Sequence, residues 1–212
     1  MKNILKWSRS KKANWILPAT IVFILFLLIT SCTLSSPSLS PPPSSPSSPS
    51  PLLPPALSSS NLALTSTAFP NGGNIPSTYA CDGANLNPPL SISNVPPTTL
   101  SLVLIMDDPD AVKVAGKVWD HWLVWNIPPE TTEIIEGKEP TGIHGKGTSG
   151  NLKYSGPCPP GGEHHYFFRI YALDSLLALE EGATKSEVLT AIQGKVIAQT
   201  ELMGKYARKP SS

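Results

Sequence analysis

The sequence is poor in charge, and none of its acidic residues comes before Asp82. Lysine and arginine number 16 against 15 aspartates and glutamates. Five of the basic residues lie within positions 2–12, which leaves 11 basic against 15 acidic residues and a net charge of −4 in the rest of the chain. Because proteins bind a phosphate backbone mainly through clustered lysine and arginine, this balance argues against nucleic acid as a partner.

Motifs of common catalytic and cofactor sites are also missing. The chain contains no Ser-His-Asp order typical of a hydrolase, no zinc signature and no phosphate-binding loop. The sequence therefore predicts no catalytic residue, no cofactor and no metal ligand.

No apolar run reaches the roughly 20 residues that a membrane-spanning helix needs. The run from Trp15 to Ile29 follows the basic segment 2–12, a combination typical of an export signal. It ends in Ile29-Thr30-Ser31-Cys32, which resembles the lipobox of bacterial lipoproteins. We therefore expect a signal peptide over 1–31, lipid on Cys32, and an exported protein anchored to a membrane of the cell envelope. An uncleaved anchor and an ordinary secretory signal stay open as alternatives.

The segment after Cys32 has almost no residue types other than serine, proline and leucine, and it has no charge. Such a composition does not bury enough apolar surface to offset the entropy of ordering. Residues 32–60 are therefore predicted to form a disordered, proline-stiffened tether. A single folded domain is expected over 61–209, followed by a short tail at 210–212.

Short apolar runs separated by turn residues characterise the chain from Asn61 onward, and this spacing predicts an antiparallel β architecture. Strands are expected at 100–106, 121–127 and 166–173, with a last short strand at 202–206. In the third of these, Tyr166 and Phe168 fall on one face and Phe167 and Arg169 on the other.

One helix is predicted near the C-terminus. Thr184 and Glu187 have the spacing of a capping box. Apolar residues then recur at helical spacing from Val188 to Val196.

All four histidines fall between positions 121 and 165, and three of them, His121, His164 and His165, lie at or just before the starts of predicted strands. His121 and His164 are the candidates for a shared pocket, whereas His144 and His165 are expected to be solvated. Asp108 and Asp110 flank Pro109, which stops the preceding strand and fixes a turn. The loop 156–162 is rich in proline and glycine, and its exposed amides would belong to Gly156, Cys158, Gly161 and Gly162.

Together these segments resemble the phosphatidylethanolamine-binding protein family, in particular its bacterial Raf-kinase-inhibitor-like branch. The matching motifs, in family order, are Tyr79-Ala80-Cys81-Asp82-Gly83-Ala84-Asn85-Leu86-Asn87-Pro88-Pro89-Leu90, Asp108-Pro109-Asp110-Ala111, Trp119-Asp120-His121-Trp122, Gly156-Pro157-Cys158-Pro159-Pro160, His164-His165-Tyr166 and Glu201-Leu202-Met203-Gly204-Lys205-Tyr206.

The resemblance implies a mainly β protein, an antiparallel β-sandwich of the phosphatidylethanolamine-binding type with one or two peripheral helices near the C-terminus. It also implies a small anion pocket at one end. Carried over by position, the ligand-binding residues are Asp108, Asp110, Trp119, His121, Gly156, Pro157, His164 and Tyr166.

A phosphate or phospholipid head group would fit such a pocket. His121, His164 and Tyr166 would donate hydrogen bonds to it. The acidic pair would orient a histidine and raise its pKa, and Trp119 would offer an apolar wall or a face for an ammonium group. The family usually has arginine where this chain has His165, and the segment 148–154 departs from the common pattern.

Cys81 and Cys158 remain once Cys32 is acylated, and both lie in segments that the resemblance places near the pocket rim. A disulfide between them and a pair of buried free thiols are both open, since an exported compartment permits oxidation.

The reading we favour is a ligand-binding or regulatory protein without turnover, to which the resemblance adds inhibition of a protease or kinase. Two other classes stay open. One is a phosphoester hydrolase with His121 or His164 as general base. The other is a metal site formed by Asp110, His121 and His164.

Overall fold

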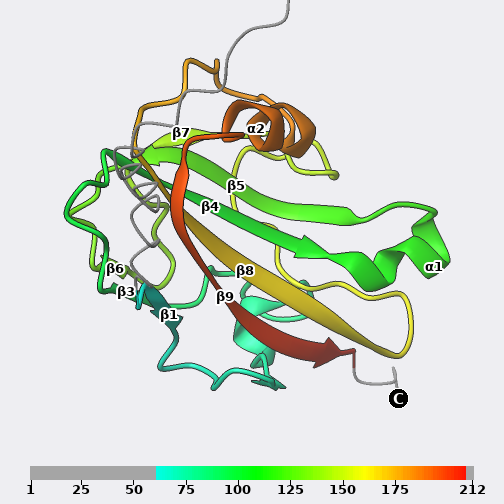
Figure 1. Ribbon diagram of the computed structural model, residues 1–212. Coiled ribbons are helices and arrows are strands. Elements are labelled where there is room, and N and C mark those ends of the chain that lie inside the picture. Colours follow the sequence, from blue (N-terminus) through cyan, green and yellow to red (C-terminus); the bar gives the residue numbers. More distant parts are fainter. Residues whose placement is uncertain (1–60, 209–212) are drawn as a thin grey trace, which may run out of the picture. The chain divides into compact units, whose positions relative to one another are not determined.

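In the computed structural model, which describes residues 61–208, two β-sheets pack face to face (Figure 1). The smaller sheet has the order β1-β3-β6, with bounds Ala63–Thr65, Leu90–Ser93 and Glu133–Ile134. The larger has the order β2-β9-β8-β4-β5-β7, with bounds Gly73–Asn74, Val196–Ala207, Glu163–Leu173, Ser101–Asp108, Trp119–Ile127 and Ile143–His144. Neighbouring strands are antiparallel apart from β2 and β9, which are parallel. The predicted mainly β, antiparallel sandwich is confirmed.

Strand β4 lies at the centre of the larger sheet and is buried along its whole length. One of its faces, with Leu104 and Met106, packs against residues of the smaller sheet such as Leu90 and Ile92. The other face packs under a helix. The buried residues of this second cluster are Val103, Ile105, Leu123, Trp125, Leu173, Leu177, Val188 and Ile192. A strand covered on both faces lacks polar alternation, which explains the continuous apolar run at 102–106.

Strand β8 shows the alternation that the sequence predicts. Tyr166, Phe168 and Ile170 are fully buried between the sheets, whereas Phe167 and Arg169 are partly exposed on the outer face. Burial of large side chains at every second position fixes the register of β8 against β4 and β9. The strand therefore delivers the residues at its start, His164 and His165, to a defined end of the sheet.

Helix α2 (Lys185–Ala191) begins with the predicted capping box, since Thr184 and Glu187 each accept the hydrogen bond expected of them. It covers the outer face of the larger sheet (Figure 1). The helix ends earlier than the spacing predicted, because Gly194 takes a left-handed conformation with φ of 74°. Val196 is therefore wrongly placed by the helical pattern; it opens β9, which is longer than the predicted 202–206 strand.

A second helix, α1 (Val112–Ala115), lies between β4 and β5 and was not predicted, whereas α2 is the helix expected near the C-terminus. Among residues 61–208, neither helix has the length and apolar character needed to cross a bilayer. The predicted signal peptide (1–31), the tether (32–60) with Cys32, residue 209 and the tail (210–212) lie outside the described residues.

Candidate functional site

The end of β4 places two neighbouring carboxylates on opposite faces of the larger sheet. Asp107 accepts hydrogen bonds from Arg169 and Lys185 on the outer face. Asp108 faces inward, where its Oδ2 lies 2.7 Å from Nδ1 of His164. Its Oδ1 accepts the backbone N–H of Ala111 at 3.1 Å and so caps the 3-10 turn that Pro109 begins. The carboxylate of Asp108, only 4% exposed, is thus held on both oxygens.

His121 lies at an irregularity in the pairing of β4 with β5. Trp122 pairs with Met106 and Asp120 with Asp107, which leaves His121 without a partner on β4. This extra residue is a β-bulge, a feature that redirects a side chain and is frequent beside functional sites. The bulge lets Asp120 share the outer face with Lys185, at 2.9 Å, while His121 turns inward and is 4% exposed.

The tautomer of His121 follows from its hydrogen bond. Its Nδ1 lies 2.6 Å from the carbonyl oxygen of Ser155. A carbonyl only accepts, so Nδ1 carries a hydrogen and Nε2 is left for a ligand. Burial lowers the pKa of His121 below its usual 6.5, against the opposing effect of the Ser155 bond and of nearby carboxylates, Asp108 first among them. The ring is therefore neutral at pH 7, and Nε2 is an acceptor until it gains a proton.

Tyr166 lies between the two histidines, in the interior. Its ring centroid is 5.3 Å from that of His121, edge to face, and 6.5 Å from that of His164, stacked. Burial raises the pKa of the phenol, and the charge of Asp108 raises it further. Its hydroxyl is fully buried beside the Asp108 carboxylate and the backbone of Cys158, without the geometry of a full hydrogen bond to either. Tyr166 therefore supports the imidazoles from behind as a neutral phenol.

A cavity of about 460 Å³ opens in front of the His121 and His164 rings. Its polar end is formed by Asp108, His121 and His164, with Trp119 beside them. Apolar side chains form much of the remaining wall: Ala111, Val114, Ala115, Pro159 and Pro160. Loop residues complete it: Cys81, Asn85, Ser149, Ser155, Gly156 and Cys158. A cavity with one polar end and apolar sides suits an amphipathic small molecule.

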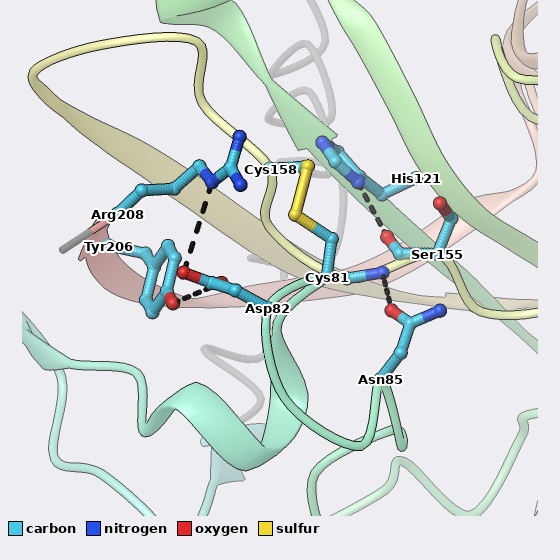
Figure 2. Close-up of a disulfide and its surroundings, with 9 residues drawn as sticks. Cys81, Asp82, Asn85, His121, Ser155, Cys158, Tyr206 and Arg208 are labelled. Atoms are coloured by element: carbon cyan, nitrogen blue, oxygen red, sulfur yellow. Dashed lines mark hydrogen bonds and ion pairs between the residues drawn. A yellow bond between two sulfur atoms is a disulfide. The ribbon is translucent and has the colours of Figure 1, made fainter. Parts of the chain in front are cut away.

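Two loops far apart in the sequence form one side of this cavity, and a disulfide between Cys81 and Cys158 joins them (Figure 2). The backbone N–H of Cys81 donates to the carbonyl of Pro157 at 3.0 Å. The N–H of Gly156 donates to Oδ1 of Asn85 at 2.8 Å. Asn85 reaches it from a left-handed conformation, φ 56°, which asparagine tolerates better than most residues.

Close approach of the same two loops explains the glycine at position 156. A Cβ at Gly156 would lie 2.1 Å from the carbonyl oxygen of Tyr79, so no side chain fits there. Its amide is bonded to Asn85 and is buried. The expectation that this amide is exposed for a ligand was wrong.

The structure brings five of the eight predicted pocket residues to the cavity wall: Asp108, Trp119, His121, Gly156 and His164. Three others lie elsewhere. Tyr166 is behind the histidines, and Pro157 is buried with its carbonyl bonded to Cys81. Asp110 points away, because the 3-10 turn rotates it out of the alternation that Asp108 follows.

Asp110 is a partner of the histidine that replaces the usual arginine. Its Oδ2 lies 2.7 Å from Nδ1 of His165 and accepts the backbone N–H of the same residue at 3.0 Å. These bonds, the side-chain one first, and the neighbouring Lys113 hold the pKa of Asp110 at about 2. His144 lies in β7, 3.6 Å from Glu139 and away from the cavity lining.

The apolar wall and Asn85 are the lining residues that sequence reasoning did not assign. Asn85 lies within the motif at 79–90, but its hydrogen bond spans 71 residues of sequence and leaves no local pattern. Val114 lies in the short helix α1, and its 59% exposure is apparent only from the fold.

The two alternative functions gain no support from the arrangement. Among residues 61–208, no hydroxyl or thiol is hydrogen-bonded to His121 or His164, as an activated nucleophile would be. Each of the proposed metal ligands is hydrogen-bonded to a different protein group: Asp110 to His165, His121 to Ser155 and His164 to Asp108. No group of three histidine, cysteine or acidic side chains in the described chain is arranged to hold a metal ion.

Comparison with known proteins gives consistent matches over this domain. The family profile described as phosphatidylethanolamine-binding protein matches residues 65–207. A UPF0098 protein of Methanothermobacter thermautotrophicus is 50% identical over 151 residues, 68% of this chain and 98% of that protein. A UPF0098 protein of Chlamydia trachomatis is 45% identical over 150 residues, 69% of this chain and 99% of that protein.

Two solved structures share the fold. The crystal structure of a putative phosphatidylethanolamine-binding protein homologue from Chlamydia trachomatis aligns with a TM-score of 0.68 and 43% identity, over 71% of this chain and 100% of that one. The crystal structure of Escherichia coli YbcL, described as a new member of the mammalian family, aligns with a TM-score of 0.65 and 30% identity, over 70% and 99%.

Proposed function

Because the chain belongs to the phosphatidylethanolamine-binding protein family, we propose that its domain binds a small phosphate ester or phospholipid head group at the polar end of the cavity. The observation that carries the proposal is the convergence of His121 and His164 beside a buried, fully bonded carboxylate. Both imidazoles use Nδ1 within the protein, so both offer Nε2 to a ligand.

The two histidines differ in what they contribute. His164 is fixed by the Asp108 carboxylate, which lies 2.7 Å from its Nδ1 and orients the ring. His121 is fixed by a neutral carbonyl and is uncharged in the empty pocket. An anion therefore meets one ring that a carboxylate orients and a second, neutral ring, His121, that has to take up a proton at Nε2 to donate.

The rest of the wall favours an ester over free phosphate. Trp119 and the alanine, valine and proline side chains beside it form an apolar surface next to the imidazoles. This surface would cover the substituent of the ester, whereas inorganic phosphate would leave it uncovered. A positively charged amine on the ligand would lie against the ring of Trp119.

Calorimetric titration of the purified full-length protein with phosphorylethanolamine tests the proposal. Binding is expected for the unaltered protein and loss of binding for His121→Ala. His144→Ala is the matched control, because His144 lies away from the cavity lining. Absence of binding by the unaltered protein would overturn the assignment.

We further propose that the protein is exported and anchored to a membrane through lipid on Cys32. The support is the basic and apolar segment 2–29 followed by Ile29-Thr30-Ser31-Cys32. Labelling with palmitate should be seen in the unaltered protein and should disappear in Cys32→Ser. Labelling that persists in the variant would contradict the anchor without affecting the ligand proposal.

A further inference from the structure

We propose that the Cys81–Cys158 disulfide is a site of exchange with dithiols, and that its reduction weakens ligand binding in the adjoining cavity. Exchange with dithiols concerns the disulfide alone. The effect of reduction on ligand binding rests on the proposed function, since it needs a ligand in the cavity.

The disulfide lies at the surface of the domain. Cys81 and Cys158 are both exposed, although each lies beside buried residues of its loop. Exchange needs a thiolate to reach a disulfide sulfur, and exposed disulfides are the ones that react in folded proteins. Both residues also line the cavity. A bridge whose only task was to stabilise the fold would not need to border the ligand site.

The bridge holds two loops of the cavity wall together. It joins the loop around Asn85 to the loop around Gly156, across 77 residues of sequence (Figure 2). Without the bridge, three hydrogen bonds still connect these loops: Cys81 to Pro157, Gly156 to Asn85, and Tyr154 to Tyr79. The two clusters of buried apolar side chains contain neither cysteine. Reduction should therefore leave the sandwich folded and loosen one wall of the cavity.

Ser155 connects this wall to His121 at the ligand site. Ser155 belongs to the same loop as Cys158, and its carbonyl sets the position and tautomer of His121. Ser155 also donates its backbone N–H to the carbonyl of His121 at 3.2 Å, so loosening of the loop after reduction would weaken the placement of Nε2 without unfolding the strand. A site that is less pre-organised binds its ligand more weakly.

The dithiol supplies the two electrons that reduce the bridge. One of its thiolates attacks a sulfur of the bridge, forming a mixed disulfide and releasing the other cysteine as a thiolate. The second thiol of the reagent then displaces the remaining cysteine and closes the reagent into its own disulfide. Two electrons and two protons pass from the dithiol to Cys81 and Cys158.

Ligand binding and reduction of the bridge affect each other reciprocally. If reduction raises the dissociation constant of the ligand by some factor, a saturating ligand must lower the equilibrium constant for reduction by the same factor. Ligand binding and the redox state of the bridge can thus be measured independently and compared.

The experiment uses the full-length protein in its oxidised form, after reduction by dithiothreitol, and as Cys81→Ser/Cys158→Ser. Free thiols are counted by alkylation and mass spectrometry without denaturant, while circular dichroism monitors the fold. Phosphorylethanolamine binding is measured by calorimetry on each form. The serine variant with and without dithiothreitol controls for effects of the reagent that do not involve the bridge.

Reduction is expected to occur in the folded protein and to raise the dissociation constant by a factor of about five or more, as couplings of this kind commonly do. The serine variant should bind like the reduced protein at either condition. Thiols that appear only on unfolding would overturn the exchange site. Equal affinity of the oxidised and reduced forms would overturn the coupling alone. Absence of binding by every form would overturn the proposed function and the coupling together, and would leave thiol formation as the test of the exchange site.

Discussion

Asp108 and His164 form the most enclosed polar pair at the cavity, with Oδ2 and Nδ1 2.7 Å apart and side chains 5% and 7% exposed. The pair joins the end of β4 to the start of β8. Because the carboxylate also caps the turn at Ala111, one side chain ties a strand end, a turn and a ligand-facing imidazole together.

Replacement of Asp108 by alanine should therefore lower stability. It removes the partner of a buried imidazole and a turn cap, and we expect a loss of about 1–3 kcal/mol in the free energy of unfolding. Urea denaturation measures this loss. Asp110→Ala is the control, and a larger loss in the control would contradict the role assigned to Asp108.

Ligand affinity should rise as the pH falls from 8 toward 6. Burial lowers the pKa of His121, whereas a bound anion favours its protonated form and raises that pKa, so binding takes up a proton between the two values. A phosphodiester such as glycerophosphorylethanolamine is the suitable ligand, because a phosphomonoester itself titrates near pH 6. Calorimetry in buffers of different ionisation enthalpy counts the protons. A pH dependence that persists in His121→Gln would assign the effect to another group.

The bond between Asp110 and His165 should stabilise the fold at neutral pH and fail in acid. The folded pKa of Asp110 is about 2, below the ordinary value of 3.8. A lowered pKa contributes stability that is present above the ordinary value and is lost as the pH falls toward the folded one. Asp110→Asn should therefore lower the urea midpoint at pH 7 and have a shrinking effect between about pH 4 and 2. An effect that stays constant over this range would argue against the shift.

Addition of a methyl group at Gly156 should displace the cavity wall. Gly156→Ala places a carbon 2.1 Å from the Tyr79 carbonyl, and we expect a loss of about 1–3 kcal/mol together with weaker ligand binding. Gly161→Ala is a matched control in the next part of the loop, where nothing lies within 4 Å of an added Cβ. Thermal unfolding and calorimetry on both variants measure the difference, and equal behaviour would contradict the close packing.

Removal of the Tyr166 hydroxyl should cost little. It is buried and makes no full hydrogen bond in the described chain, so Tyr166→Phe should leave the free energy of unfolding unchanged or raise it by up to about 1 kcal/mol. Denaturation measures this change. Ligand affinity should also be kept, because the ring remains behind the imidazoles; a large loss of affinity would mean that the phenol donates to the ligand.

The strands could be predicted because their signals are local, whereas the sandwich arrangement was predicted from the family resemblance. The apolar run at 102–106 and the alternation at 166–172 reflect burial of β4 on both faces and of β8 on one. The capping box at Thr184 is equally local, and it marked the start of α2. Its end was misjudged because Val196 continues a helical spacing beyond Gly194, and the left-handed glycine overrides that spacing.

The site was harder to predict because its geometry depends on contacts between distant segments. The family resemblance placed Asp110 in the pocket with Asp108, but a 3-10 turn separates them. The amide of Gly156 looked free in the sequence, and only the fold shows Asn85 as its acceptor. The convergence of His121 and His164 was expected from strand starts, whereas the bulge that turns His121 inward leaves no mark in the sequence.

That bulge sets a limit on how this protein could be redesigned or could diverge. Deleting one residue at 120–121 would restore regular pairing with β4, and a procedure that rewards ideal sheets would favour the change. After such a deletion, one residue would replace Asp120 and His121, which now point to opposite faces of the sheet. Either the contact to Lys185 or the imidazole at the cavity would then be lost. Length changes at 120–121 should therefore not be tolerated, because the two faces of the sheet need both residues.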